Sequence, residues 1–195
     1  MRTGRVSRKT TETDITLALI LDGSGRHSVA SGVPFLDHML AQLARHGLID
    51  LELTCTGDVE VDYHHTVEDV GICLGQALRQ ALGEGEGIRR FGQALAPMDE
   101  ALVLAALDVS GRGHVELDLC LQAAKIGDFD TELVAEFMRA FATNAGVTLH
   151  LRQLAGTNGH HIVESAFKSV ALALRDAVAT DPRRTGVPST KGSLL

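Results

Sequence analysis

A motif that occurs twice constrains the fold of this chain more than any other feature. Residues 64–68 are His-His-Thr-Val-Glu, and residues 160–164, 96 positions later, are His-His-Ile-Val-Glu. The sequences that follow, 70–79 and 166–175, are helix-like and similar to each other. Self-similarity at a fixed separation is the signature of a repeated structural unit. We therefore predict a chain built from two similar halves.

The remaining segments recur in the same order, which supports the duplication. The paired segments are strand-like runs at 15–21 and 102–107, helix-like patterns at 34–47 and 131–146, and short strands at 50–56 and 147–153. Both helix-like patterns have apolar residues three and four positions apart, and both stop at a glycine suited to a left-handed cap. The number of residues that separates the two members differs from pair to pair, as insertions in loops would produce.

We expect one compact α+β domain across residues 1–195. Its two repeats, about 10–86 and 98–180, pack back to back, because the glycine-rich turn between them (83–87) is too short for a flexible linker. The length agrees with a single domain of roughly 100–200 residues. The tail, 181–195, contains two prolines and two glycines, so we expect it to be irregular and folded over another part of the protein.

Composition excludes several classes of protein. A net charge of −7 argues against a nucleic-acid partner held by overall basicity. The N-terminus lacks the apolar region of a signal peptide, and no run approaches about 18 apolar residues, so we expect no membrane partner and a cytoplasmic location. Cys55, Cys73 and Cys120 are odd in number and lie in apolar runs, which favours reduced core residues over a disulfide framework.

The repeated motif has the chemistry of a divalent metal site. Imidazole and carboxylate are usual ligands of such ions. On a helix, His64 and Glu68 share a face because they are four residues apart. The adjacent His65 diverges from His64 by about 100° around the axis. The two imidazoles of one motif therefore do not readily bind the same ion. The two motifs predict two similar metal sites, each with ligands from both halves or from different subunits.

A third pair of positions extends the ligand set. His38 in the first half matches Glu136 in the second, and both side chains can bind metal. The predicted ligands are then His38, His64, His65, Glu68, Glu136, His160, His161 and Glu164. The share of carboxylates favours Mn²⁺, Fe²⁺ or Zn²⁺ over a metal bound by thiolates.

Other residues carry weaker signals. His27, His46 and His114 are interpreted as structural, whereas His150 is either a ligand, a supporting residue or neither. An anionic substrate would need local positive charge, and the candidates are Arg89, Arg90, Arg112, Arg183, Arg184 and Lys191.

Together these residues resemble the imidazoleglycerol-phosphate dehydratase family of histidine biosynthesis. The resemblance covers essentially the whole chain and rests on segments 35–40, 62–69, 108–112, 148–150, 160–168 and 188–192. It implies a hydro-lyase that converts D-erythro-imidazoleglycerol phosphate to imidazoleacetol phosphate with two Mn²⁺ ions per active site. It also implies mixed sheets with helices, of the ribosomal-protein-S5-domain-2-like type, and a homo-oligomer of twenty-four subunits with active sites at subunit interfaces.

The resemblance also assigns roles to residues. The two ions would hold the substrate ring as an imidazolate, which expels the hydroxyl of the adjacent carbon. Glu12 corresponds to the family's active-site glutamate and would accept the C2 proton, with Glu68 and Glu164 as other catalytic carboxylates. By itself, Glu12 looks like an ordinary edge-strand glutamate. The implied substrate-binding residues are Glu12, His38, His64, His65, Arg90, Arg112, His160, His161, Lys168, Ser189, Thr190 and Lys191.

One position departs from the family pattern, and two other functions remain as alternatives. Many members have histidine where this chain has Glu136, although glutamate can fill the ligand role. A metal-dependent hydrolase would use the same ligands, but no additional nucleophile motif is present. A metal-storage or metal-sensing protein would not need Arg90, Arg112 and Lys191 converging on a phosphate.

Overall fold

The computed structural model describes residues 1–194, which form two four-stranded sheets, a two-stranded hairpin and four helices. The first half contains β1 (Thr3–Lys9), β2 (Thr13–Ile20), β3 (His27–Ala30), α1 (Pro34–Gly47), β4 (Asp50–Gly57) and α2 (His64–Leu82). The second contains β5 (Phe91–Met98), β6 (Ala101–Val109), β7 (His114–Asp118), β8 (Lys125–Ile126), β9 (Phe129–Asp130), α3 (Leu133–Ala145), β10 (Val147–Ala155) and α4 (Gly159–Val178).

The two sheets have the same topology, which confirms the internal duplication. Their strand orders are β1-β2-β4-β3 and β5-β6-β10-β7. In each sheet the first three strands are antiparallel, and the last strand pairs in parallel with its neighbour. Among residues 1–194, the short strands β8 and β9 form a hairpin that has no counterpart in the first half. The predicted class, a duplicated α+β domain, is therefore correct.

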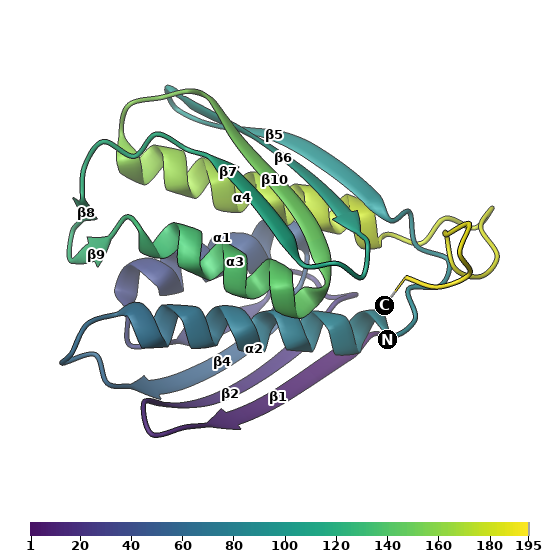
Figure 1. Ribbon diagram of the computed structural model, residues 1–195, viewed down its shortest axis with the longest axis horizontal. Helices are drawn as coiled ribbons and strands as arrows, with labels where there is room; N and C mark the ends of the chain where they lie inside the picture. The colour runs from purple at the N-terminus through teal and green to yellow at the C-terminus, as the bar shows by residue number, and fades with distance from the viewer. Residues whose placement is uncertain (195) are drawn as a thin grey trace.

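The sheets form the outer layers and the four helices lie between them (Figure 1). Within each half, α2 packs on β1 and β2, and α4 packs on β5 and β6. Across the halves, α1 packs on α4 and α2 packs on α3. The core is thus shared by both halves, and each helix pair at its centre contains one helix from each repeat.

Alternating burial explains how the strands supply the core. On β2, Ile15, Leu17 and Leu19 are buried while the intervening residues face outward, as the two-residue period of a strand requires. Phe137 and Phe141, one turn apart on α3, stack with ring centroids 6.3 Å apart, and Phe137 also contacts Phe167 of α4. The helices therefore meet over a continuous apolar interior.

Several details differ from the sequence prediction. Each half begins with a further strand, β1 or β5, before the predicted strand-like run. At the end of α1 the left-handed residue is Leu48, with φ of 55°, and Gly47 is still helical, whereas Gly146 caps α3 as predicted.

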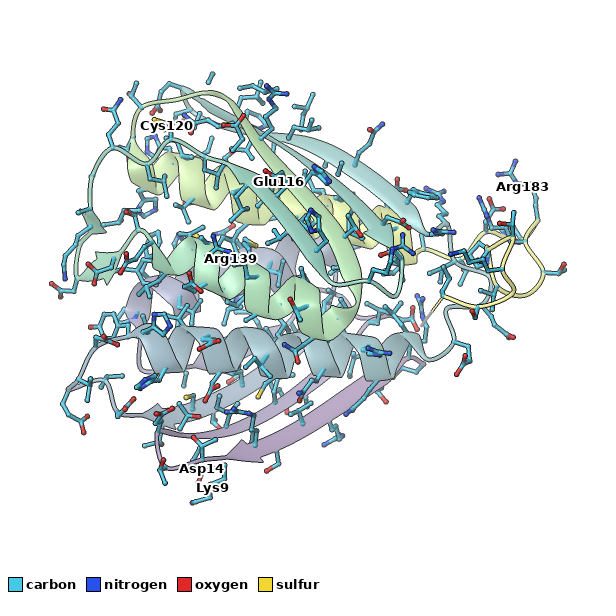
Figure 2. All side chains as sticks on the ribbon, in the orientation of Figure 1. Lys9, Asp14, Glu116, Cys120, Arg139 and Arg183 are labelled. Carbon is cyan, nitrogen blue, oxygen red and sulfur yellow. The ribbon has the colours of Figure 1, made fainter. Side chains whose placement is uncertain are left out.

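The cysteines also depart from the prediction in part. Cys73 is buried and Cys55 half-buried, and burial raises the pKa of each thiol to about 11. Cys120 does not belong to the core, because it is exposed in the loop after β7, at the outside of the fold (Figure 2).

The C-terminal tail follows α4 as a series of turns that rest on the loop before β5. The Gly87 amide donates to Gly186, and the Asp181 amide donates to Gly87. Leu194 packs against the hydrophobic core. No helix within residues 1–194 combines the length and apolar character needed to cross a membrane.

Gly75 tests the packing of α2 on α3. A Cβ atom at this position would lie 2.6 Å from the Phe141 carbonyl oxygen and 2.8 Å from the Ala145 amide nitrogen. Alanine would gain about 1 kcal/mol of helix propensity, but overpacking against backbone costs about 1–3 kcal/mol. We expect Gly75→Ala to lower the free energy of unfolding in urea, whereas Arg79→Ala, exposed on the same helix, has little effect. An unchanged or higher stability for Gly75→Ala would contradict this packing.

Asp50 gives a pH-dependent test of the first sheet. Its carboxylate accepts hydrogen bonds from the Ser24 amide at 2.7 Å and from the Arg26 amide and guanidinium, and these contacts lower its pKa well below the usual range. Ionised Asp50 therefore stabilises the fold above the ordinary aspartate pKa of about 3.9, and this contribution is lost as the pH falls through the lower folded value.

We expect Asp50→Asn to lower the melting temperature at pH 7 by about 2–4 °C. The difference from the wild type should shrink as the pH falls below about 4, because the unfolded wild-type chain then takes up a proton that Asp50 in the folded chain does not. Melting curves of both proteins between pH 3 and 7 measure it. A difference that stays constant over this range would show that the Asp50 charge contributes nothing.

Candidate active site

Three of the predicted ligands meet in one cluster. His38 Nε2 lies 3.3 Å and His160 Nε2 3.2 Å from Glu164 Oε2. In the part of the chain that the structure describes, these are the only three histidine, cysteine or acidic side chains whose ligand atoms all lie within 4.8 Å of one another. Two imidazoles and one carboxylate fit a divalent ion that keeps further coordination positions open.

Local structure explains how this cluster forms. Asn158 caps α4 by accepting hydrogen bonds from the amides of His160 and His161, so the helix begins at the motif. His160 and Glu164 are then one turn apart on one face, and the packing of α1 on α4 adds His38 from the other half. The cluster therefore depends on contact between the two repeats.

Glu164 is an ionised carboxylate in a nearly buried position. It is 6% exposed, and Lys168 Nζ lies 2.6 Å from Oε1. Burial opposes ionisation, but the hydrogen bonds and charges of Lys168 and His38 prevail and lower the pKa of Glu164. Lys168, predicted to bind phosphate, thus lies at the candidate metal ligand within its own chain.

The equivalent ligands on α2 and α3 do not form a cluster. His64 Nε2 is 3.8 Å from Glu68 Oε2 on α2. Glu136 lies on α3, and its carboxylate pairs with Arg139 at 2.6 Å on the same helix (Figure 2 shows Arg139 on α3). The duplication places this set on equivalent helices, but within residues 1–194 it does not close into a three-ligand group.

The second histidine of each motif points to different partners. His65 Nδ1 lies 2.9 Å from Asp58 Oδ2, and His161 Nδ1 lies 2.7 Å from Glu100 Oε2. These hydrogen bonds raise the pKa of both imidazoles, and the bond from His161 lowers the pKa of Glu100 to about 2. Adjacent histidines therefore face separate environments within one chain.

Glu12 lies beside one of these histidines. Its Oε1 is 3.7 Å from His65 Nε2, and its amide donates to Thr10 Oγ1. Glu12 is in the turn between β1 and β2 and not in an edge strand as its sequence context suggested. The turn places an exposed carboxylate next to the N-terminus of α2.

The other predicted phosphate-binding residues lie elsewhere. Arg90 pairs with Asp108 at 2.7 Å and donates to the Pro188 carbonyl at 2.9 Å, which joins it to the tail containing Ser189, Thr190 and Lys191. Arg112 donates to the Ser110 carbonyl in the turn before β7. The Arg90 amide also bonds to Ala177, near the end of α4.

Apart from Lys168, the phosphate candidates around Arg90 and the tail are therefore separated from the metal cluster in a single chain. His160 is at the start of α4 and Ala177 near its end, a rise of about 25 Å at 1.5 Å per residue. Figure 1 shows the tail at the opposite end of α4 from its first turn. The chain does not bring the two sets of residues together by itself.

The remaining histidines lie outside the cluster. His27 contacts the Gly25 carbonyl and His46 contacts Gln42, while burial lowers the pKa of His46. His150 is exposed on β10, with its ring 6.1 Å from that of His114, so its position gives no support to a ligand role.

Sequence reasoning missed Asp58 and Glu100. Both lie in loops, where no helical or strand period marks them. For Glu100 a signal existed, because it directly precedes β6 as Glu12 directly precedes β2. Asp58 has no such mark.

Comparison with known proteins decides the family. The family model described as imidazoleglycerol-phosphate dehydratase matches residues 31–174. The chain belongs to the imidazoleglycerol-phosphate dehydratase family. As a member of this dehydratase family it is a lyase.

Relatives with this family name match over nearly their whole length. The imidazoleglycerol-phosphate dehydratase of Desulforamulus reducens is 60% identical over 99% of this chain and 98% of its own. That of Symbiobacterium thermophilum is 60% identical over 100% and 93%.

Two solved dehydratase structures have the same fold. The enzyme of Staphylococcus aureus superposes with a TM-score of 0.84 at 34% identity, covering 92% of this chain and 99% of the other. The Pyrococcus furiosus enzyme gives a TM-score of 0.84 at 39% identity, covering 97% and 100%.

Proposed function

We propose that this dehydratase converts D-erythro-imidazoleglycerol phosphate to imidazoleacetol phosphate, in the cytoplasm, as a step of histidine biosynthesis. The observation that carries the proposal is the His38–His160–Glu164 cluster in a chain of this family. The substrate contains an imidazole, whose two ring nitrogens suit two divalent ions. The repeated motif offers two sets of ligands for such ions.

We propose Mn²⁺ as the metal, with two ions per active site. His38, His160 and Glu164 would hold one ion, and His64, Glu68 and Glu136 would contribute to the second, with His65 and His161 completing the two sites. For this, Glu136 must turn from Arg139, an exposed partner on its own helix. Bound ions would act as Lewis acids toward the ring nitrogens of the substrate.

Glu12 would accept the proton from C2 of the glycerol part of the substrate. Its carboxylate is 48% exposed and 3.7 Å from a ligand histidine, so it is free to meet a substrate held beside His65. The C2–H electrons form the new double bond as hydroxide leaves the adjacent carbon. The resulting enol takes its ketone form, and the net change is loss of one water.

We propose that another copy of the chain supplies most of the phosphate-binding residues, with Lys168 beside the metal cluster of its own chain. Arg90, Arg112, Ser189, Thr190 and Lys191 offer guanidinium, ammonium and hydroxyl donors. Arg90 contacts Ala177 and Pro188 at the far end of α4 from His160, about 25 Å along the helix. We therefore propose active sites at subunit interfaces in a homo-oligomer, for which the family resemblance implies twenty-four subunits.

Two other functions are less consistent with these residues. A metal-dependent hydrolase would use the same ligands, but the sequence has no additional nucleophile motif, and a metal-storage protein would need no base such as Glu12. Release of imidazoleacetol phosphate from the phosphorylated substrate distinguishes dehydration from both.

Removal of metal tests the function directly. We expect chelator-treated protein to lose activity on imidazoleglycerol phosphate and Mn²⁺ to restore it. No side chain of the ligand clusters can replace the Lewis acidity of the ion. Product formation is measured with metal content verified by mass spectrometry. Full turnover in metal-free protein would contradict the metal-dependent mechanism, and no turnover with any divalent ion would contradict the assigned reaction.

Glu12→Gln tests the proposed base. Glutamine keeps the shape of the side chain but cannot accept a proton at neutral pH, so we expect kcat to fall by about 10²–10⁴-fold. Asp14→Asn is a matched control from the same hairpin, since Asp14 pairs with Lys9 beside it (Figure 2). A wild-type kcat in Glu12→Gln would show that another carboxylate, such as Glu68 or Glu164, accepts the proton.

A further inference from the structure

Two imidazoles in this chain are held at Nδ1 by carboxylates from separate loops. Asp58 contacts His65 at 2.9 Å, and Glu100 contacts His161 at 2.7 Å. By contrast, His38 and His160 meet Glu164 through Nε2, within the candidate cluster. The anchored residue is thus the second histidine of each His-His motif, and neither of the two belongs to the intrachain cluster.

The two acids occupy non-equivalent places in the duplication. Asp58 follows β4, whereas Glu100 precedes β6. A simple copy of the first half would have placed the second acid after β10, where the chain instead has Ala155, Gly156 and Thr157. The same carboxylate–imidazole contact is therefore supplied by a different loop in each half. It is not a by-product of the shared fold.

Each acid is itself fixed by its surroundings. Glu100 accepts hydrogen bonds from the Asn158 amide at 2.9 Å and from the Thr157 amide at 3.4 Å. The Asp58 amide donates to the Glu12 carbonyl at 3.1 Å. Asp58 Oδ1 is buried and has no hydrogen-bond partner among residues 1–194. The other oxygen, Oδ2, is the one that contacts His65 Nδ1.

The contact determines which ring nitrogen can bind metal. A carboxylate at Nδ1 accepts its proton, and the lone pair then lies on Nε2. In both halves Nε2 points away from the anchoring acid, towards Glu12 at 3.7 Å for His65 and Asp99 at 3.9 Å for His161. Each ring therefore presents Nε2 at the end of the molecule where the helices begin.

We propose that Asp58 and Glu100 are positioning residues that preset His65 and His161 as Nε2 ligands for a metal ion whose other ligands belong to another copy of the chain. The inference rests on the proposed function. A ligand that acts across an interface gains no orientation from the other ligands of its own chain, so a neighbouring carboxylate must supply it. Such supporting contacts typically change metal affinity by about 10–100-fold.

The test measures Mn²⁺ binding to metal-free protein by calorimetry at pH 8, where the histidines are largely neutral. We expect Asp58→Ala to weaken Mn²⁺ binding by about 10–100-fold, and Asp58→Asn, which keeps an acceptor oxygen, to weaken it less. Glu60→Ala removes an exposed acid from the same loop and should leave binding unchanged. Glu100→Ala should repeat the effect in the second half.

The Asp58→Ala change made in a His65→Ala protein distinguishes a positioning role of Asp58 from a general structural role. In a His65→Ala protein, which already lacks the ring, adding Asp58→Ala should cause little further loss of affinity, because Asp58 acts through His65. Equal losses with and without His65, or wild-type affinity in Asp58→Ala, would overturn the inference. If wild-type protein binds no Mn²⁺, the proposed function fails instead.

Discussion

The packing of one repeat's helices on those of the other is the contact on which the structure depends. α1 lies on α4 and α2 on α3, so neither half can bury its helices alone. The same contact places His38 next to His160 and Glu164. Stability and the candidate metal site therefore arise from one interface inside the chain, and a change that separates the helices would affect both.

Electrostatics at the cluster is set by opposing effects. Glu164 is almost completely buried, which favours its neutral form, but Lys168 at 2.6 Å and His38 keep it ionised. A buried carboxylate already in its charged state can bind a cation without first losing a proton. His65 and His161, outside the cluster, are oriented by Asp58 and Glu100 in the loops, so these ligands also have defined positions before a metal arrives.

The sequence predicted those parts of the fold that have a strong period. The bounds of α1 agreed with its apolar spacing, and the repeated motif located the starts of α2 and α4. β1 and β5 were missed because their buried positions are occupied mostly by small residues, Gly4 and Val6 on β1 and Gly92 and Ala96 on β5, which give a weak apolar pattern. Cys120 was misplaced because an apolar neighbourhood in sequence does not establish burial.

The site was predictable where ligands recur and not where they depend on tertiary contact. Repetition identified His160 and Glu164, but the orientation of Glu136 towards Arg139 depends on side-chain contacts that spacing does not specify. Asp58 and Glu100 were missed because two different loops supply them. The family resemblance identified Glu12, whose own sequence context was uninformative.

The central claim is that one active site combines metal ligands and phosphate-binding residues from different subunits. It is tested by mixing two impaired variants, His160→Ala and Lys191→Ala, and allowing them to assemble together. Activity is measured at low substrate concentration, with mixed assembly verified by native mass spectrometry. The account predicts that activity reappears in the mixed assemblies, because some sites receive an intact His160 from one chain and an intact Lys191 from another. If mixed assemblies form and stay as inactive as the separate variants, both residues act from the same chain and the account is wrong.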